Sequence, residues 1–189
     1  MSIYVLGYGS LMNVESASRT LKREIKLSDL IQVNLLGYAR VWTVKDKIYS
    51  EKLAKRVDAV FLNIEKSSNF GQGINCILIK ITQAELEKIK IREKNYNCID
   101  VSNSVKPKQD KSIDPSSKIF AFIGKDTSKI KKKDPNLFIM GMYIKMVLTA
   151  CRNLGVNFLQ EFKNTTQIAR FKVIDGNYVF VELEQAKYV

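Results

Sequence analysis

Short runs of β-branched and aromatic residues, spread along most of the chain, constrain the fold of this sequence most strongly. Such runs are typical of β-strands, and they occur at residues 3–8, 31–44, 57–64, 75–81, 98–101 and 118–124. Gly37 interrupts the second run and indicates a bend or bulge. Because the runs mostly follow one another without an intervening helix, we expect an α+β fold. Its sheet should be small, mixed and largely antiparallel, a β-barrel with flanking helices.

Two segments carry helix signals. Thr82-Gln-Ala-Glu85 is a capping box, which predicts a short helix to about Lys90. Asp134 followed by Pro135 matches an N-cap and first helical position, so the longest helix is predicted to start there and end at Gly155. Apolar residues repeat along it at helical spacing, and we expect most of them to pack in the core. The repeat comprises Phe138, Met142, Met146 and Ala150, flanked by Ile139, Tyr143 and Val147.

The length of 189 residues and the 46% apolar content fit one domain with a sizeable core, so we expect a single domain over residues 1–189. Residues 158–162 either extend the long helix or start another. Near the C-terminus, Asp175-Gly176 separates two strand-like runs and suits a tight turn. Residues 170–186 are therefore predicted to form a C-terminal hairpin extension.

The sequence contains no histidine, which excludes histidine-dependent triads and histidine-ligated zinc or iron. Acid–base chemistry must therefore come from carboxylates, tyrosine, lysine or cysteine. The three cysteines, Cys76, Cys98 and Cys151, show no metal-binding or redox spacing. We expect no metal site and no cofactor.

The chain is basic, with 31 Lys and Arg against 19 Asp and Glu and a formal charge of +12. Such an excess could attract nucleic acid. The lysines are spread along the chain, however, and the short basic loop of Lys129 and 131–133 lacks the aromatic residues of a base-stacking surface. We therefore expect no nucleic-acid partner. Without a long apolar run or a signal peptide, a cytoplasmic protein without a membrane partner is expected.

Four features occur in a specific order along residues 3–162. A first strand ends in Tyr8-Gly9-Ser10-Leu11-Met12, and a second contains Gly37-Tyr38-Ala39-Arg40. A helix then runs into Arg92-Glu93-Lys94-Asn95-Tyr96, and the last helix carries Tyr143. In this order the sequence resembles the γ-glutamylcyclotransferase-like family, which includes the AIG2-like proteins.

The resemblance implies a small β-barrel that cyclises γ-glutamyl amides to 5-oxoproline. It implies that Glu93 is the general base, and that Tyr8, Gly9, Ser10, Leu11 and Tyr143 bind the substrate. Two positions depart from the family pattern: Lys90 stands where many members have aspartate, and Leu11 where the glutathione-related enzymes often have asparagine.

Several alternatives remain open at this stage. Tyr8 either fills the core or touches substrate, Tyr143 fits a core position better than a ligand position, and Arg40 has either a structural role or a charged partner. The protein is either an enzyme acting on a small γ-glutamyl substrate or a binding protein with the same pocket; a nucleic-acid-binding module is the weaker third hypothesis. The amine half of the substrate and the oligomeric state are not predicted.

Overall fold

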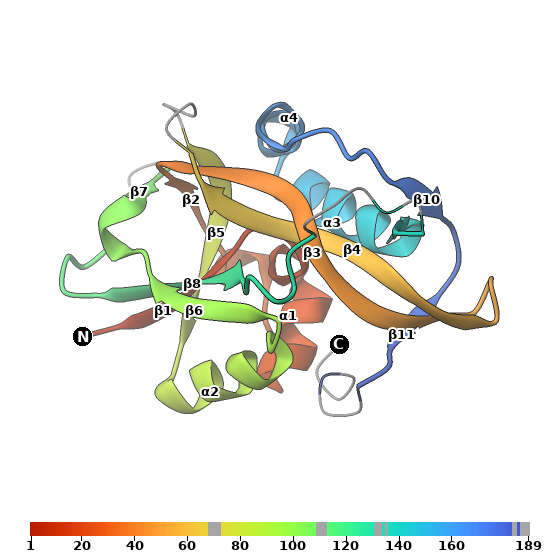
Figure 1. The fold of residues 1–189 in the computed structure, drawn as a ribbon. Coiled ribbons are helices and arrows are strands. Elements are labelled where there is room, and N and C mark those ends of the chain that lie inside the picture. The colour runs from red at the N-terminus through yellow and green to blue at the C-terminus, as the bar shows by residue number, and fades with distance from the viewer. Residues whose placement is uncertain (68–72, 109–112, 131–133, 135, 183–184, 186–189) are drawn as a thin grey trace.

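The computed structural model describes residues 1–67, 73–108, 113–130, 134, 136–182 and 185. Within these ranges the strands form a six-stranded sheet A and a five-stranded sheet B. Figure 1 shows the long β3–β4 pair of sheet B crossing the molecule, with α4 above it and α2 below it in this view. The predicted α+β class with mostly antiparallel pairing is confirmed.

Sheet A has the strand order β6-β8-β1-β5-β2-β7, and only the β1–β8 pair is parallel. Its strands are β6 (Tyr96–Asp100), β8 (Lys118–Gly124), β1 (Ile3–Gly7), β5 (Ile74–Ile81), β2 (Ile31–Leu35) and β7 (Val105–Pro107). The β1 strand is thus flanked on both sides, and the loop that follows it starts from the interior of the sheet.

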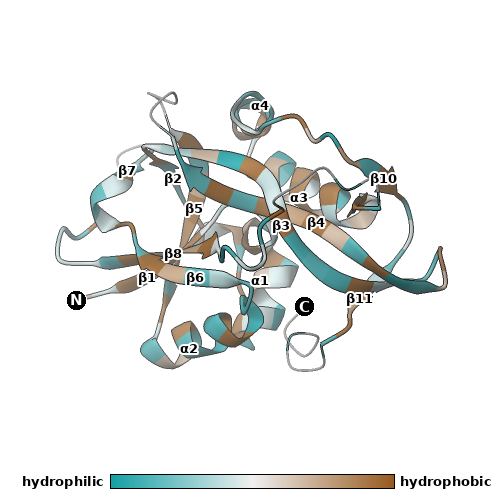
Figure 2. Ribbon diagram, in the orientation of Figure 1, coloured by the Kyte–Doolittle hydropathy of each residue, from teal (hydrophilic) through white to brown (hydrophobic). Residues whose placement is uncertain are grey.

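Sheet B has the order β10-β9-β4-β3-β11. Its strands are β10 (Lys172–Ile174), β9 (Phe138–Met140), β4 (Lys55–Lys66), β3 (Tyr38–Ser50) and β11 (Tyr178–Phe180). Both β3 and β4 carry hydrophilic and hydrophobic residues along their length (Figure 2). Residues of β3 such as Val41, Val44 and Ile48 are buried, whereas Lys45, Lys47 and Tyr49 on the same strand are exposed.

The two sheets do not close into the predicted barrel in the described part of the chain. Gly37 adopts a left-handed conformation with φ of 74°, which glycine accepts without strain. The chain leaves sheet A at this turn, and β3 then pairs with β4 in sheet B. The bend predicted at Gly37 is therefore present, and it separates two sheets instead of bending one.

Four α-helices are found in the described ranges: α1 (Val14–Leu21), α2 (Gln83–Arg92), α3 (Gly141–Asn153) and α4 (Val156–Thr165). Short 3-10 turns are η1 (Ser10–Met12), η2 (Leu27–Asp29) and η3 (Ser102–Ser104). The predicted capping box is present, with Glu85 N donating to Thr82 Oγ1 over 3.2 Å and Thr82 N donating to Glu85 Oε2 over 2.7 Å. Gly155, with φ of 122°, separates α3 from α4.

The start predicted for the long helix was wrong. Asp134 accepts a hydrogen bond from Asn136 N at its side chain (2.9 Å), which makes a turn, while Pro135 lies outside the described residues. Phe138–Met140 then form β9, which pairs with β10 and β4, and α3 begins only at Gly141. Strand pairing with a distant segment has overridden the local helix-start signal.

The predicted C-terminal hairpin was also wrong. The β10 strand pairs with β9, whereas β11 pairs with β3 at the opposite edge of sheet B. Gly176 does adopt a left-handed φ of 108°, but the chain continues across the sheet. Residues 183, 184 and 186 of the predicted hairpin lie outside the described residues.

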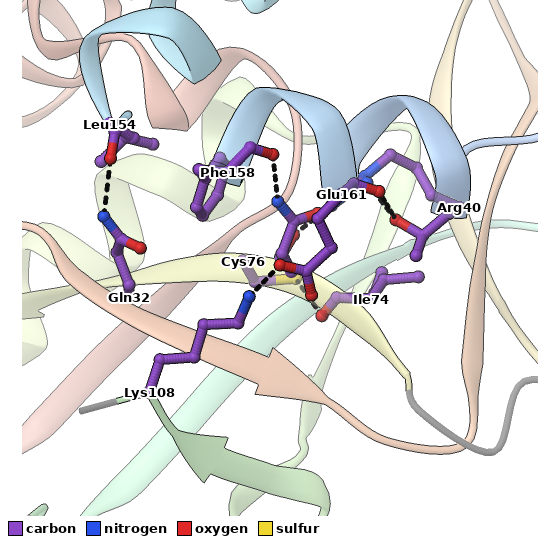
Figure 3. A network of polar contacts seen from close by, with 10 residues as sticks. Gln32, Arg40, Ile74, Cys76, Lys108, Leu154, Phe158 and Glu161 are labelled. Atoms are coloured by element: carbon purple, nitrogen blue, oxygen red, sulfur yellow. Dashed lines mark hydrogen bonds and ion pairs between the residues drawn. The ribbon is translucent and has the colours of Figure 1, made fainter. Parts of the chain in front are cut away.

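A polar network fastens α4 and the end of α3 to sheet A and its β7 edge (Figure 3). Asn75 Nδ2 on β5 donates to the Phe158 carbonyl (2.8 Å), and Gln32 Nε2 on β2 donates to the Leu154 carbonyl (2.9 Å). Lys108 forms an ion pair with Glu161. These contacts hold α4 next to Asn75 of β5, whose carbonyl accepts a hydrogen bond from the buried Arg40 of β3.

None of the helices in the described ranges combines the length and the apolar character that a membrane-spanning helix needs.

Candidate functional site

Glu93 occupies the C-cap position of α2, where its backbone N–H donates to the Ile89 carbonyl. The helix is anchored at its start by the capping box and carries its apolar residues Leu86 and Ile89 into the core. This places the Glu93 carboxylate inside the molecule, with its side chain 17% exposed and Arg92 Nε 3.5 Å from its Oε1.

The loop Tyr8–Leu11 follows β1 and is held from two sides. Arg40 Nε donates to the Tyr8 carbonyl over 3.0 Å, and the Tyr8 hydroxyl donates to the Phe122 carbonyl of β8 over 2.6 Å. On the other side, Arg92 Nη2 donates to Ser10 Oγ over 2.7 Å. The loop is therefore fixed in position relative to Glu93, the residue next to Arg92.

The amides of this loop have no hydrogen-bond acceptor within the described part of the chain. Among the hydrogen bonds found between described residues, none has the N–H of Gly9, Ser10 or Leu11 as its donor. The first amides of a helical turn have no partner within the turn. A Cβ atom on Gly9 would lie 3.0 Å from the Tyr143 hydroxyl, so the glycine lets that hydroxyl approach the loop backbone.

The loop and Glu93 line the same small cavity of about 40 Å³, here called the inner pocket. A volume of this size holds about three water-sized groups. Its lining consists of residues 6–11 together with Leu62, Glu93, Tyr96, Phe122 and Tyr143.

A larger cavity of about 640 Å³, here called the outer cavity, adjoins the inner pocket. The two share the lining residues Ser10, Glu93, Tyr96 and Tyr143. The rest of the outer cavity comes from α1 and its cap Asn13, Arg92 of α2, α3, the β3–β4 pair, residues 177–180 and Gln185. The two cavities therefore form one site with a narrow polar end and a wide end.

Burial raises the pKa of the Glu93 carboxyl above its ordinary value, and the neighbouring Asp46 carboxylate raises it further. The Arg92 guanidinium opposes both effects. A raised pKa makes the carboxylate a stronger proton acceptor than an exposed glutamate.

Asp46 is a second carboxyl group in the outer cavity. Burial raises its pKa, while the Gln185 side-chain amide, which donates to Asp46 Oδ2 over 2.8 Å, opposes that effect. Lys47 N also donates to Asp46 Oδ1 (2.8 Å). Because both of its oxygens accept hydrogen bonds from the protein, Asp46 is held in one orientation, from which it adds to the negative potential around Glu93.

Three tyrosines surround Glu93: Tyr8, Tyr96 and Tyr143. Burial raises the pKa of each phenol, so all three stay protonated near neutral pH. The Tyr8 and Tyr96 hydroxyls donate to the carbonyls of Phe122 and Leu62, the latter over 3.0 Å. Their rings therefore shape the inner pocket, while their hydroxyl protons are directed to the backbone.

Arg92 joins α2 to α1 and to the Tyr8–Leu11 loop. Besides Ser10 Oγ, its guanidinium donates to Thr20 Oγ1 over 2.5 Å and to Ser16 Oγ over 3.2 Å. Only 5% of its side chain is exposed. A planar guanidinium can satisfy several acceptors at once, so this one side chain sets the spacing between loop, helix and Glu93.

The structure brings together all six candidate residues predicted from the sequence. Tyr8, Gly9, Ser10, Leu11, Glu93 and Tyr143 all line the inner pocket. Lys90, by contrast, is paired with Glu87 over 2.8 Å on the exposed face of α2 and lines neither cavity. The substitution at Lys90 therefore leaves the surroundings of Glu93 unchanged.

Arg40 has a structural role. Its side chain is fully buried, and besides the Tyr8 carbonyl it donates to the Asn75 carbonyl and, over 3.1 Å, to Thr166 Oγ1. The ring of Phe162 lies 4.2 Å from its guanidinium carbon. In the described part of the chain no carboxylate forms an ion pair with it, so it holds the loop from behind and stays away from Glu93.

Several site residues were missed by the sequence reasoning. Arg92 and Tyr96 belong to the same Arg-Glu-x-x-Tyr segment as Glu93, and that motif could have indicated them. The α1 residues that face the outer cavity could have been found through Asn13, whose side chain caps the helix by accepting from Ser16 N (2.9 Å). Asp46, Phe61, Tyr178 and Phe180 carry no local signal, because only the arrangement of sheet B brings them together.

In the described residues, no group of three or more cysteine, aspartate or glutamate side chains is arranged to hold a metal ion.

Comparisons with protein-family models and with curated protein sequences gave no match. Solved structures do match. YkqA from Bacillus subtilis superposes with a TM-score of 0.56 at 16% identity, over 86% of this chain and 53% of YkqA. The chain thus spans about half the length of YkqA.

The human uncharacterized protein loc79017 superposes with a TM-score of 0.52 at 14% identity, over 92% of this chain and 94% of that protein. A glutathione-specific γ-glutamyl cyclotransferase from yeast is also similar, at 12% identity over 91% of this chain and 93% of that one, but its TM-score of 0.45 is too low to add to the fold assignment. At such identities similarity extends to the fold and not to the activity. The chain therefore shares its fold with YkqA and loc79017.

Proposed function

We propose that the protein is an enzyme that cyclises γ-glutamyl amides, releasing 5-oxoproline and an amine. The observation that carries the proposal is the inner pocket, where a partly buried carboxylate with a raised pKa faces a glycine-containing loop with unpartnered amides. An intramolecular amide cyclisation needs proton transfer and stabilisation of the oxyanion.

The first step is activation of the substrate's own α-amine. In a peptide-like reference an α-ammonium has a pKa of about 7.7–8.0, so it must lose a proton before it can attack. The Glu93 carboxylate accepts that proton. The free amine then attacks the γ-carbonyl carbon, which forms the new C–N bond of the five-membered ring.

The attacked carbonyl oxygen develops negative charge as the tetrahedral intermediate forms. We expect the amides of Gly9, Ser10 and Leu11 to donate to this oxygen, and one donor of this kind typically contributes about 3–4 kcal/mol to lowering the barrier. When the intermediate collapses, the original amide C–N bond breaks, and the Glu93 carboxylic acid returns its proton to the departing amine. The ring nitrogen, which became positively charged on attack, gives its surplus proton to the regenerated Glu93 carboxylate, which passes it to the released amine so that the amine leaves as an ammonium ion.

The geometry of the pocket also favours the reaction by restricting the substrate. A γ-glutamyl chain is flexible, and cyclisation requires its amine and γ-carbonyl to meet. The inner pocket of about 40 Å³ between the loop and Glu93 has room for the reacting γ-carbonyl and amine only when these two groups lie next to each other. Holding two reacting groups in this way can replace several kcal/mol of activation entropy, up to about 7–11 kcal/mol in the best intramolecular cases.

The test is to incubate the protein with γ-glutamyl amides and measure 5-oxoproline by mass spectrometry. We expect equal molar amounts of 5-oxoproline and free amine, with the amine nitrogen of 5-oxoproline coming from the substrate. If the amides bind, as measured by calorimetry, but no 5-oxoproline is released from any of them, the enzyme hypothesis is wrong and a binding protein with the same pocket is the correct reading.

A further inference from the structure

The outer cavity has an aromatic face that begins at the inner pocket. The Tyr143 ring, which lines both cavities, lies edge-on to Phe61 with a centroid distance of 5.0 Å. Phe61 stacks on Phe180 at 5.4 Å with an interplanar angle of 28°, and Phe180 meets Tyr178 edge-on at 5.8 Å. These four rings form a continuous surface from the inner pocket into the outer cavity.

Apolar side chains continue this surface to the solvent. Met142 and Val179 both line the outer cavity, yet they are 43% and 55% exposed. Met146, also in the lining, is only partly buried. The helical spacing predicts that most of the apolar residues of this helix pack in the core; Met146 packs against the core and also lines the cavity, whereas Met142 is an exposed exception. Large apolar side chains left exposed around a cavity are characteristic of binding sites.

The charged residues of the outer cavity do not favour either sign of charge. Glu15, Glu51, Arg19 and Lys145 line it, and all four are exposed. Two of them are acidic and two are basic, so their potentials largely cancel. The remaining charged groups are Asp46, which is bound by Gln185, Glu93, and Arg92, which is bound by Ser10, Ser16 and Thr20. The whole lining thus holds four acidic and three basic side chains.

The direction of the substrate follows from the connection of the two cavities. If the γ-carbonyl lies in the inner pocket between the loop and Glu93, the amine half bonded to it must extend into the outer cavity. Its path runs along the rings of Phe61 and Phe180. A bulky apolar group there loses water-exposed surface against aromatic side chains, whereas a methyl group does not reach them.

We propose that the outer cavity is a specificity subsite that selects γ-glutamyl amides with an uncharged, bulky apolar or aromatic amine half, and that Phe180 of β11 is its main contact. This inference rests on the proposed function for the placement of the γ-glutamyl half. It assigns to residues 177–180 a role in substrate choice, separate from the chemistry at Glu93.

Three γ-glutamyl amides test the subsite: the methylamide, the 2-phenylethylamide and the cationic 4-aminobutylamide. Their dissociation constants are measured by calorimetry on the Glu93→Gln protein, so that turnover does not disturb the titration. We expect the 2-phenylethylamide to bind about tenfold or more tighter than the methylamide. The 4-aminobutylamide, of similar length, should bind more weakly than the 2-phenylethylamide. A gain below about threefold for the phenyl compound, or tightest binding of the cationic compound, overturns the proposal.

Phe180→Ala is added to the Glu93→Gln protein. We expect it to remove the preference for the phenyl compound, so that the dissociation constant of the methylamide divided by that of the 2-phenylethylamide falls towards one. Phe171→Ala is the matched control, because Phe171 lies in the same C-terminal stretch but packs against a separate cluster around Val60 and lines neither cavity. It should leave the ratio as it was. If Phe180→Ala leaves the ratio unchanged as well, Phe180 is not the contact and the proposal is wrong.

The wild-type protein separates this inference from the proposed function. If 5-oxoproline is released and the binding ratio is near one, the enzyme proposal stands and the subsite is refuted. If the ratio is high but none of the three amides yields 5-oxoproline, the cavity selects apolar ligands and the cyclisation proposal is refuted.

Discussion

The inner pocket and the outer cavity are built by different parts of the chain and held by different interactions. The loop of the inner pocket follows β1 in the interior of sheet A and is fixed by hydrogen bonds from Arg40 and Arg92. The far wall of the outer cavity comes from β11, an edge strand that pairs with β3 over three residues only. In the proposed enzyme, the groups that act on the reacting atoms are therefore rigidly positioned. The groups proposed to select the amine lie on a less constrained segment.

Replacing Glu93, the proposed base, should cause the largest loss of activity, and this loss should arise in the inner pocket. We expect Glu93→Gln to lose about 10³–10⁴-fold in kcat with γ-glutamyl amides, the upper part of the range for a general acid–base group. Glu87→Gln is the matched control, since Glu87 lies on the same helix and its side chain is exposed.

The Glu93→Gln protein should also unfold at the same or a higher temperature near neutral pH. The carboxyl has a raised pKa in the folded state, so ionisation costs folding free energy above the unfolded-state pKa, and the neutral amide avoids that cost. A large drop in the melting temperature would mean that the lost activity reflects unfolding, and the assignment of Glu93 would lose its support.

Disturbing the spacing between the loop and Glu93 should have the next largest effect. Arg92→Lys keeps the charge but cannot reach Ser10, Ser16 and Thr20 together, and we expect a loss of about 10²-fold in kcat/KM, a typical cost of a displaced reacting group. Most of the loss should fall on kcat, because the loop amides act on the transition state.

Arg23→Lys is the control for this substitution, as Arg23 pairs with Glu85 outside both cavities. If Arg92→Lys raises KM and leaves kcat unchanged, Arg92 supports substrate binding only. The proposal that Arg92 holds the loop at a fixed distance from Glu93 for catalysis would then be wrong.

The smallest effect should come from Asp46, which lies in the outer cavity but acts electrostatically on the inner pocket. Its carboxylate raises the pKa of Glu93, so Asp46→Asn should lower that pKa. Because Glu93 must be deprotonated to accept the substrate's proton, the acidic limb of the profile of kcat/KM against pH should move to lower pH. Asp58→Asn is the control, because Asp58 lies on β4 and pairs with Lys47 outside the cavities; it should not move the acidic limb of the profile. A shift of that limb to higher pH in Asp46→Asn would contradict the electrostatic effect of Asp46 on Glu93.

The inner pocket could be predicted from the sequence because its parts are short, contiguous motifs. Tyr8–Leu11 and Arg92–Tyr96 each carry their own signal, and the capping box at Thr82 fixes the helix that delivers Glu93. What the sequence did not reveal was the network that joins them, since Ser16 and Thr20 come from α1, a segment too polar to identify as a helix by apolar periodicity.

The outer cavity could not be predicted, because it depends on pairings between distant residues. The Asp175-Gly176 turn is compatible with a hairpin locally, yet β11 pairs with β3 about 130 residues earlier in the chain, for example Phe180 with Ile48. The same applies to Asp134, whose helix-start signal is overridden by the pairing of Phe138–Met140 with β10. Local patterns fix the kind of element, and non-local pairing decides which elements share a cavity.

The most direct test of the central claim is to locate the γ-glutamyl half in the protein. A ¹H–¹⁵N correlation spectrum of the wild-type protein is recorded during titration with 5-oxoproline, the proposed product, whose ring carbonyl is the former γ-carbonyl. Shifts that are largest at the amides of Gly9, Ser10 and Leu11 and weaken markedly in the Glu93→Gln protein are the predicted result. Saturable binding that leaves these three amides unchanged and shifts residues elsewhere would contradict the account.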